Sequence, residues 1–148
     1  MVLLLEIFAT LAAGLFSGAS IYISLVEHPA RMQCGTVVAL VQFAPSYKRA
    51  TVMQASLAAA GFLLAIGAWI LGAGVHWLAG GMLLGLVIPF TLIVILPTNR
   101  RLLSSALAKD SPEAQRLLDR WGKLHAVRSV LSFSSFLVFL FALLQRFR

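Results

Sequence analysis

Four long segments with almost no charged residues dominate this chain and restrict it to one kind of architecture. Residues 3–26 contain Glu6 as their single charge, and residues 50–75, 76–96 and 129–144 contain no Asp, Glu, Lys or Arg. A helix of about 20 such residues crosses the hydrocarbon core of a bilayer, which is roughly 30 Å thick. The sequence therefore predicts an all-α integral membrane protein with four spans.

The spans fill the chain and leave no room for a soluble domain. We place them at about residues 3–26, 50–75, 76–96 and 127–145, within a single four-helix membrane domain covering residues 1–148. Helices of this length and composition pack side by side in a bundle.

Sequence signals at the helix ends add three details. Pro29 biases the preceding residue away from helical angles, so helix one is expected to end near Glu27. The apolar residues 36–43 are too short to span and predict an interfacial or re-entrant segment between helices one and two. Asp110 or Ser111 is a suitable cap for a helix that begins at Pro112 and is long enough to project beyond the membrane.

The charge pattern predicts an orientation in a cell (inner) membrane. Most basic residues follow spans one and three, whereas Arg146 and Arg148 lie at the opposite side. The positive-inside rule then places loops 1–2 and 3–4 in the cytoplasm and both termini outside. The net charge of +7 is explained by contacts with membrane lipid, and no nucleic-acid-binding module is present. A single cysteine, Cys34, excludes an internal disulfide.

Polar residues recur at helical spacing at the same end of all four spans. Span four carries a polar face formed by Trp121, His125, Arg128, Ser132 and Ser135, and span one carries one formed by Ser17, Ser20, Ser24, Glu27 and Arg31. A single serine within a membrane helix usually forms a hydrogen bond to a neighbouring helix, and an Arg or Trp at a helix end usually lies at the membrane–water interface. Their convergence instead predicts a pocket, with these candidate site residues: His125, His28, Arg128, Asn99, Arg31, Glu27, Trp121, Tyr47, Gln54, Ser24 and Ser132.

Three short motifs in this order carry a resemblance to a known family. They are EHPAR at residues 27–31, PTNRRL at 97–102 and WxxxHxxR at 121–128. With the four spans, they resemble the anthrone oxygenase-like family of small membrane proteins, over nearly the whole chain. The resemblance implies an oxygenase that acts on a lipophilic anthrone- or quinol-like substrate with molecular oxygen, and no cofactor is expected.

Such chemistry requires a base and a group that stabilises an anion. A histidine has an ordinary pKa of about 6.5, so His125 or His28 is suited to deprotonate the substrate. Arg128 and Asn99 would stabilise the oxyanion in a site poor in water. The apolar helix walls would admit a flat lipophilic substrate from the bilayer.

The residues also allow redox alternatives. Arg31 or Glu27 would orient a histidine in the oxygenase interpretation, but the histidines also suit metals. His28 and His125 could be axial ligands of a haem within the bundle. A divalent metal could instead be held by Glu27, His28 and His125.

A non-catalytic role is the other alternative. A lipid- or metabolite-binding protein, or a transporter, could use Arg31, Arg100 and Arg128 to bind an anionic head group. Glycines spaced four apart at residues 14–18 and 81–85 suit close helix packing within one bundle and homo-oligomer formation equally.

Overall fold

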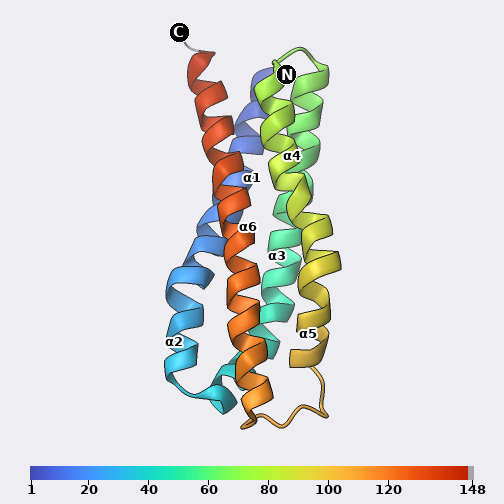
Figure 1. Ribbon diagram of the computed structural model, residues 1–148. Helices are drawn as coiled ribbons and strands as arrows, with labels where there is room; N and C mark the ends of the chain where they lie inside the picture. The colour runs from blue at the N-terminus through green and yellow to red at the C-terminus, as the bar shows by residue number, and fades with distance from the viewer. Residues whose placement is uncertain (147–148) are drawn as a thin grey trace.

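The computed structural model is a bundle of four long helical rods, and it describes residues 1–146. Figure 1 shows both termini and the α3–α4 turn at one end of the bundle, with α2, α5 and the start of α6 at the other. No strand occurs within the described residues. The elements, in order, are α1 (Val2–Tyr22), the π-helical turn η1 (Ile23–Glu27), α2 (His28–Gln33), α3 (Thr36–Ile70), α4 (Val75–Phe90), the π-helical turn η2 (Thr91–Ile95), α5 (Leu96–Leu102) and α6 (Pro112–Gln145).

The four rods confirm the predicted all-α membrane architecture. Each rod is long and apolar enough to cross a bilayer. Large apolar side chains are exposed along their outer surfaces, as at Leu25 and Ile93, which are both 72% exposed. An apolar exterior of this extent suits lipid rather than water. The protein is therefore a membrane protein.

The first and third rods each contain a π-helical turn that ends two residues before a proline. Pro29 follows η1, and Pro97 follows η2. A proline ring clashes with the carbonyl four residues earlier, which here belongs to the π turn in both rods. The wider π turn accommodates the ring, so each rod continues through its proline. The predicted helix end near Glu27 is therefore wrong, and helical structure extends to Gln33.

The segment expected to lie separately between helices one and two is part of the second rod. Residues 36–43 form the first turns of α3, which runs without interruption to Ile70 and contains Pro45. The break between the first and second rods lies earlier, at Gly35, whose φ of +86° ends the preceding helix. The prediction of a separate interfacial or re-entrant segment was wrong because an apolar stretch this short does not reveal whether it continues into the next helix.

Three of the four glycines that suggested close helix contacts, Gly14, Gly81 and Gly85, lie against side chains of neighbouring helices, and so does Gly61. A Cβ atom at Gly61 would lie 2.6 Å from Leu84, and one at Gly85 would lie 2.7 Å from Phe62. These contacts bring α3 and α4 together near the end that carries the termini, where an apolar cluster including Trp77 and Phe139 forms the core. The bundle is therefore tightly packed at this end.

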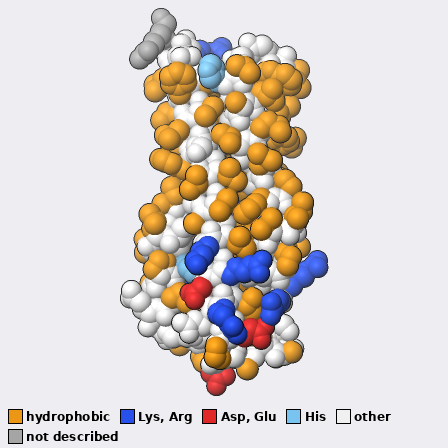
Figure 2. Space-filling view, in the orientation of Figure 1, with side chains coloured by type: hydrophobic (Ala, Val, Ile, Leu, Met, Phe, Trp, Pro, Cys, Tyr) orange, Lys and Arg blue, Asp and Glu red, His pale blue; other side chains and the backbone are white. Residues whose placement is uncertain are grey.

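The fourth helix begins as its sequence predicts. Ser111 caps α6 by accepting a hydrogen bond from the Ala114 amide at 3.1 Å, and Pro112 occupies the first turn. A second apolar cluster, which includes Phe43, Leu118 and Trp121, packs near this end of the bundle. Figure 2 shows that Lys and Arg side chains gather here, whereas the opposite half is mainly hydrophobic.

Candidate functional site

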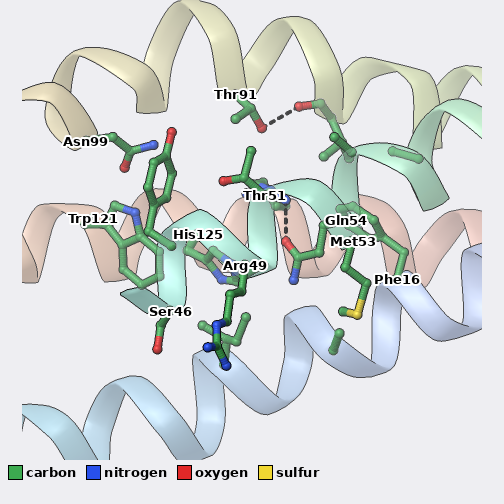
Figure 3. Close-up of a pocket in the computed structure, with 18 of the residues that line it drawn as sticks. Phe16, Ser46, Arg49, Thr51, Met53, Gln54, Thr91, Asn99, Trp121 and His125 are labelled. Atoms are coloured by element: carbon green, nitrogen blue, oxygen red, sulfur yellow. Dashed lines mark hydrogen bonds between the residues drawn. The ribbon is translucent and has the colours of Figure 1, made fainter. Parts of the chain in front are cut away.

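A cavity of about 540 Å³ lies between the two apolar clusters. Phe16 and Ala58 from one cluster and Phe43 and Trp121 from the other contribute to its lining. All four rods supply residues, and the lining is mostly apolar with a few polar groups. Figure 3 shows Trp121 and His125 side by side on α6, with Gln54 and Met53 on α3 and Phe16 on α1. This composition is typical of a small-molecule site.

His125 lies on the α6 wall of this cavity and is held by a hydroxyl from the first rod. Its side chain is 2% exposed, and its Nδ1 lies 3.0 Å from the Oγ of Ser24. The Ser24 hydroxyl lies in turn 2.8 Å from the Oγ of Ser129. The histidine ring also stacks on Trp121, with 4.8 Å between ring centroids. The imidazole is thus fixed in position on two sides.

Arg128, one turn further along α6, also lines the cavity. Its Nη2 donates to the Oε1 of Gln54 at 2.7 Å, and its guanidinium lies 5.4 Å from the centre of the Phe16 ring. None of the ion pairs within residues 1–146 involves Arg128, and its Nε has no hydrogen-bond partner there. A partly buried cation with neutral partners favours an anionic ligand.

Arg31 and Glu27 form a pair with each other at the end of the cavity. Arg31 donates to the Glu27 carboxylate, which also accepts a hydrogen bond from Gln42 at 2.8 Å. The Arg31 guanidinium lies 5.7 Å from the centre of the Trp121 ring. Within the described chain, neither residue is hydrogen-bonded to a histidine. The prediction that one of them orients a histidine was wrong, because Ser24 occupies that position beside His125.

His28 lies behind the cavity rather than in it. It is buried against Trp121, with ring centroids 5.1 Å apart, and its Nε2 lies 2.5 Å from the place where a Cβ atom at Gly122 would be. The absence of a side chain at position 122 makes room for this ring. His28 is not among the residues that line the cavity, so its imidazole and that of His125 do not open on a common space.

The metal-binding alternatives therefore find no matching arrangement. An iron held between His28 and His125 would need both rings to face one space, and the Trp121 ring packs against each of them. In the part of the chain that the structure describes, no group of three or more His, Cys, Asp or Glu side chains is placed to hold a metal ion. The predicted set of Glu27, His28 and His125 is thus not assembled.

The structure brings most of the predicted site residues to one cavity. Those that line it are His125, Arg128, Asn99, Arg31, Glu27, Trp121, Tyr47 and Gln54. Ser24 stands behind His125 as its hydrogen-bond partner. Ser132 is not part of the lining. It is buried further along α6, where it donates to the Ser129 carbonyl at 3.1 Å.

Several lining residues were not predicted from the sequence. The spacing of four and three places Thr51 on the same helix face as Tyr47 and Gln54, but it was not included among the candidate site residues. Phe16 could not be recognised, because an apolar residue within an apolar span gives no signal. Other residues in this group are Phe43, Ser46, Arg49, Met53 and Thr91.

The anthrone oxygenase family model matches residues 43–138 of the 148 residues in this chain. The chain belongs to the anthrone oxygenase family. The match includes the α3, α5 and α6 walls of the cavity, with Gln54, Asn99, His125 and Arg128. The Glu27–Arg31 pair precedes the matched range.

A relative among the anthrone oxygenases covers more of the chain. The anthrone oxygenase tpcL of Aspergillus fumigatus is 28% identical over 139 residues, which cover 87% of this chain and 86% of that protein. No solved structure matches the chain significantly. Membership of this family indicates an oxygenase-like function.

Proposed function

We propose that this protein is a membrane oxygenase that deprotonates a lipophilic aromatic substrate in the cavity and lets the resulting anion react with molecular oxygen. The observation that carries the proposal is the placement of His125 and Arg128 on one wall of the cavity, with Arg128 free of any ion pair among the described residues. His125 acts as the base, and Arg128 stabilises the anion. Family membership supports the same reaction class.

An anthrone-like substrate suits these groups. Its central CH2 is acidified by the two flanking rings and by the carbonyl conjugated with it across the central ring, and loss of a proton leaves a delocalised enolate with its negative charge largely on oxygen. That anion passes electrons to oxygen far more readily than the neutral molecule does. In the complete reaction both C–H bonds of the CH2 break and a C=O bond forms. One atom of O2 enters the product, and the other leaves as water, so no further reductant is needed.

Two buried side-chain amides in the cavity lining have polar atoms without partners. Asn99 is 1% exposed, and its Oδ1 has no hydrogen-bond partner within the described residues. The Nε2 of Gln54 is likewise without a partner there, whereas its Oε1 accepts from Arg128. Buried polar atoms without partners are costly, and a bound ligand that pairs with them removes that cost. The unpaired Gln54 Nε2 can donate to an anion, whereas the unpaired Asn99 Oδ1 can only accept, as from a substrate hydroxyl. Both therefore support a polar ligand in the cavity.

The size and position of the cavity suit a flat lipophilic molecule. About 540 Å³ falls within the usual range of roughly 300 to 1,000 Å³ for small-molecule sites. Tyr22, Met53 and Leu92 belong to the lining and are also exposed on the outer surface of the rods. Their exposure supports lateral entry of the substrate from the surrounding lipid along an apolar route.

The proposal includes an orientation in the membrane. The end of the bundle that carries the cavity, α2 and α5 also carries most of the basic side chains (Figure 2). The positive-inside rule places this end at the cytoplasmic face of a cell (inner) membrane and the termini outside. Arg146 lies at the other end of the bundle, and Arg148 falls outside the described residues.

The test is the fate of labelled oxygen in purified, detergent-solubilised protein supplied with anthrone and 18O2. We expect anthraquinone to form faster than in protein-free micelles and to carry one 18O atom. Arg128→Gln should lower the rate by about 100-fold, as loss of a group that stabilises an oxyanion does. Arg120→Gln, an exposed change on the same helix, is the matched control and should leave the rate unchanged.

Two results would contradict the proposal. One is an oxidation rate equal to that of protein-free micelles, given that anthrone oxidises slowly on its own. The other is retention of unchanged anthrone by the protein, which would indicate the non-catalytic binding role. In that alternative Arg31, Arg100 and Arg128 bind an anionic head group, but Arg31 is paired with Glu27 and Arg100 is not part of the cavity lining.

A further inference from the structure

A row of hydrogen-bonding groups connects His125 to the backbone of the first rod. His125 Nδ1 lies 3.0 Å from Ser24 Oγ, Ser24 Oγ lies 2.8 Å from Ser129 Oγ, and Ser129 Oγ lies 3.0 Å from the carbonyl oxygen of Ser20. His125, Ser129 and Ser20 are buried, with exposures of 2%, 7% and 0%. The row lies on the side of the imidazole that contacts α1 and η1.

The direction of these hydrogen bonds follows once the single Ser129 proton is placed. A carbonyl oxygen only accepts, and a serine hydroxyl has a single proton to donate. With the Ser129 proton on the nearest carbonyl, that of Ser20, the longer contacts of 3.3 Å to Ser20 Oγ and 3.4 Å to the His125 carbonyl oxygen would use the same proton. Ser129 therefore accepts from Ser24. Because the Ser24 proton is then used, Ser24 must accept from His125 Nδ1.

We propose that Ser24 and Ser129 hold His125 in the tautomer protonated at Nδ1, which leaves Nε2 unprotonated as the nitrogen available to the cavity. The two serines are positioning residues, since neither lines the cavity. The opposite tautomer would require Ser129 to donate its proton to Ser24. Neither the Ser20 carbonyl nor the His125 carbonyl would then receive that proton. The row of hydroxyls thus selects one tautomer.

The catalytic meaning of this arrangement rests on the proposed function. A base must offer a lone pair to the proton it removes, and Nε2 offers one only in this tautomer. In that step the substrate C–H bond breaks, its electron pair stays on the substrate, and the proton forms an N–H bond at Nε2. The positive charge on the ring is stabilised by the hydrogen bond from Nδ1–H to the Ser24 oxygen.

The tautomer can be measured without any substrate. In protein labelled with 15N-histidine, the two ring nitrogens have distinct chemical shifts when protonated and unprotonated, and a His125→Gln variant identifies the His125 signals among the three histidines. At a pH where this ring is neutral, we expect the signal of a protonated Nδ1 and an unprotonated Nε2. A wild-type His125 protonated at Nε2 would overturn the proposal.

Variants separate positioning from general stability. Ser24→Ala and Ser129→Ala should convert the single tautomer into a mixture, whereas Ser24→Thr keeps the hydroxyl and should keep the tautomer. Ser135→Ala is the matched control, because it removes a buried serine on α6 that donates to the Gly80 carbonyl at 2.7 Å, away from His125. An unchanged His125 spectrum in both Ser24→Ala and Ser129→Ala would refute the role of the two hydroxyls.

Turnover measurements test the catalytic meaning separately. Ser24→Ala should lower kcat by about tenfold with little change in KM, because it affects the base rather than the binding surface. If the spectra behave as expected but no variant or wild-type protein oxidises anthrone, the tautomer assignment stands and the proposed oxygenase function fails. If the wild-type protein is active with Nε2 protonated, the tautomer assignment fails and the function stands.

Discussion

Arg128 on α6 and Gln54 on α3 are joined by a hydrogen bond of 2.7 Å between Nη2 and Oε1. Gln54 is 3% exposed, so the amide fixes the guanidinium without neutralising its charge. A carboxylate at this position would form an ion pair and cancel the field in the cavity. The neutral partner keeps the arginine available for an anion that arises during the reaction.

The charge at this contact can be changed almost without a change of shape. Gln54→Glu places a carboxylate beside Arg128, and we expect kcat/KM for anthrone oxidation to fall by at least about tenfold, equivalent to about 1.4 kcal/mol. Gln115→Glu, at an exposed position of α6, adds the same charge elsewhere and should have little effect. Equal kcat/KM values for Gln54→Glu and wild type, in folded protein, would show that the free charge of Arg128 is not used.

Gly122 provides the space that His28 occupies behind Trp121. A Cβ atom at this position would lie 2.5 Å from His28 Nε2, so Gly122→Ala should destabilise the protein by about 1 to 3 kcal/mol. Thermal unfolding in detergent micelles would measure this as a lower Tm. Gly18→Ala is the control, since nothing lies within 4 Å of its added Cβ atom.

A double variant tests the cause of this effect. His28→Ala removes the ring that the new methyl group meets, so adding Gly122→Ala to His28→Ala should cost much less than Gly122→Ala costs alone. Equal costs in the two backgrounds would show that the destabilisation does not arise from contact with His28.

An ion pair joins the two ends of the chain at the opposite end of the bundle from the cavity. Arg146 Nη1 lies 2.8 Å from both carboxylate oxygens of Glu6, and the side chains are 41% and 3% exposed, respectively. Arg146→Gln should therefore destabilise the fold more than Glu6→Gln, because it leaves a buried carboxylate unpaired, whereas an arginine left alone can reach water or lipid phosphate. A comparison of the two Tm values measures this asymmetry, and a lower Tm for Glu6→Gln would contradict it.

The sequence predicted the architecture and much of the cavity because those features depend on neighbours close in the chain. Apolar length defines a span, and residues three and four apart share a helix face, which placed Trp121, His125 and Arg128 together. The cap at Ser111 is equally local. The same reasoning failed at Pro29, where the π turn lets the helix continue and no rule of spacing predicts that turn.

The tertiary structure alone decided which helix faces meet and in what register along the bundle. Ser24 and His125 are separated by 101 positions, and Gln54 and Arg128 by 74, so their pairing depends on the register between helices. That register is set by close contacts such as Gly61 against Leu84, whose fit involves the shapes of two rods at once. The sequence by itself thus determined four apolar membrane helices with polar residues at one common end, and packing determined that Ser24 rather than Glu27 orients His125.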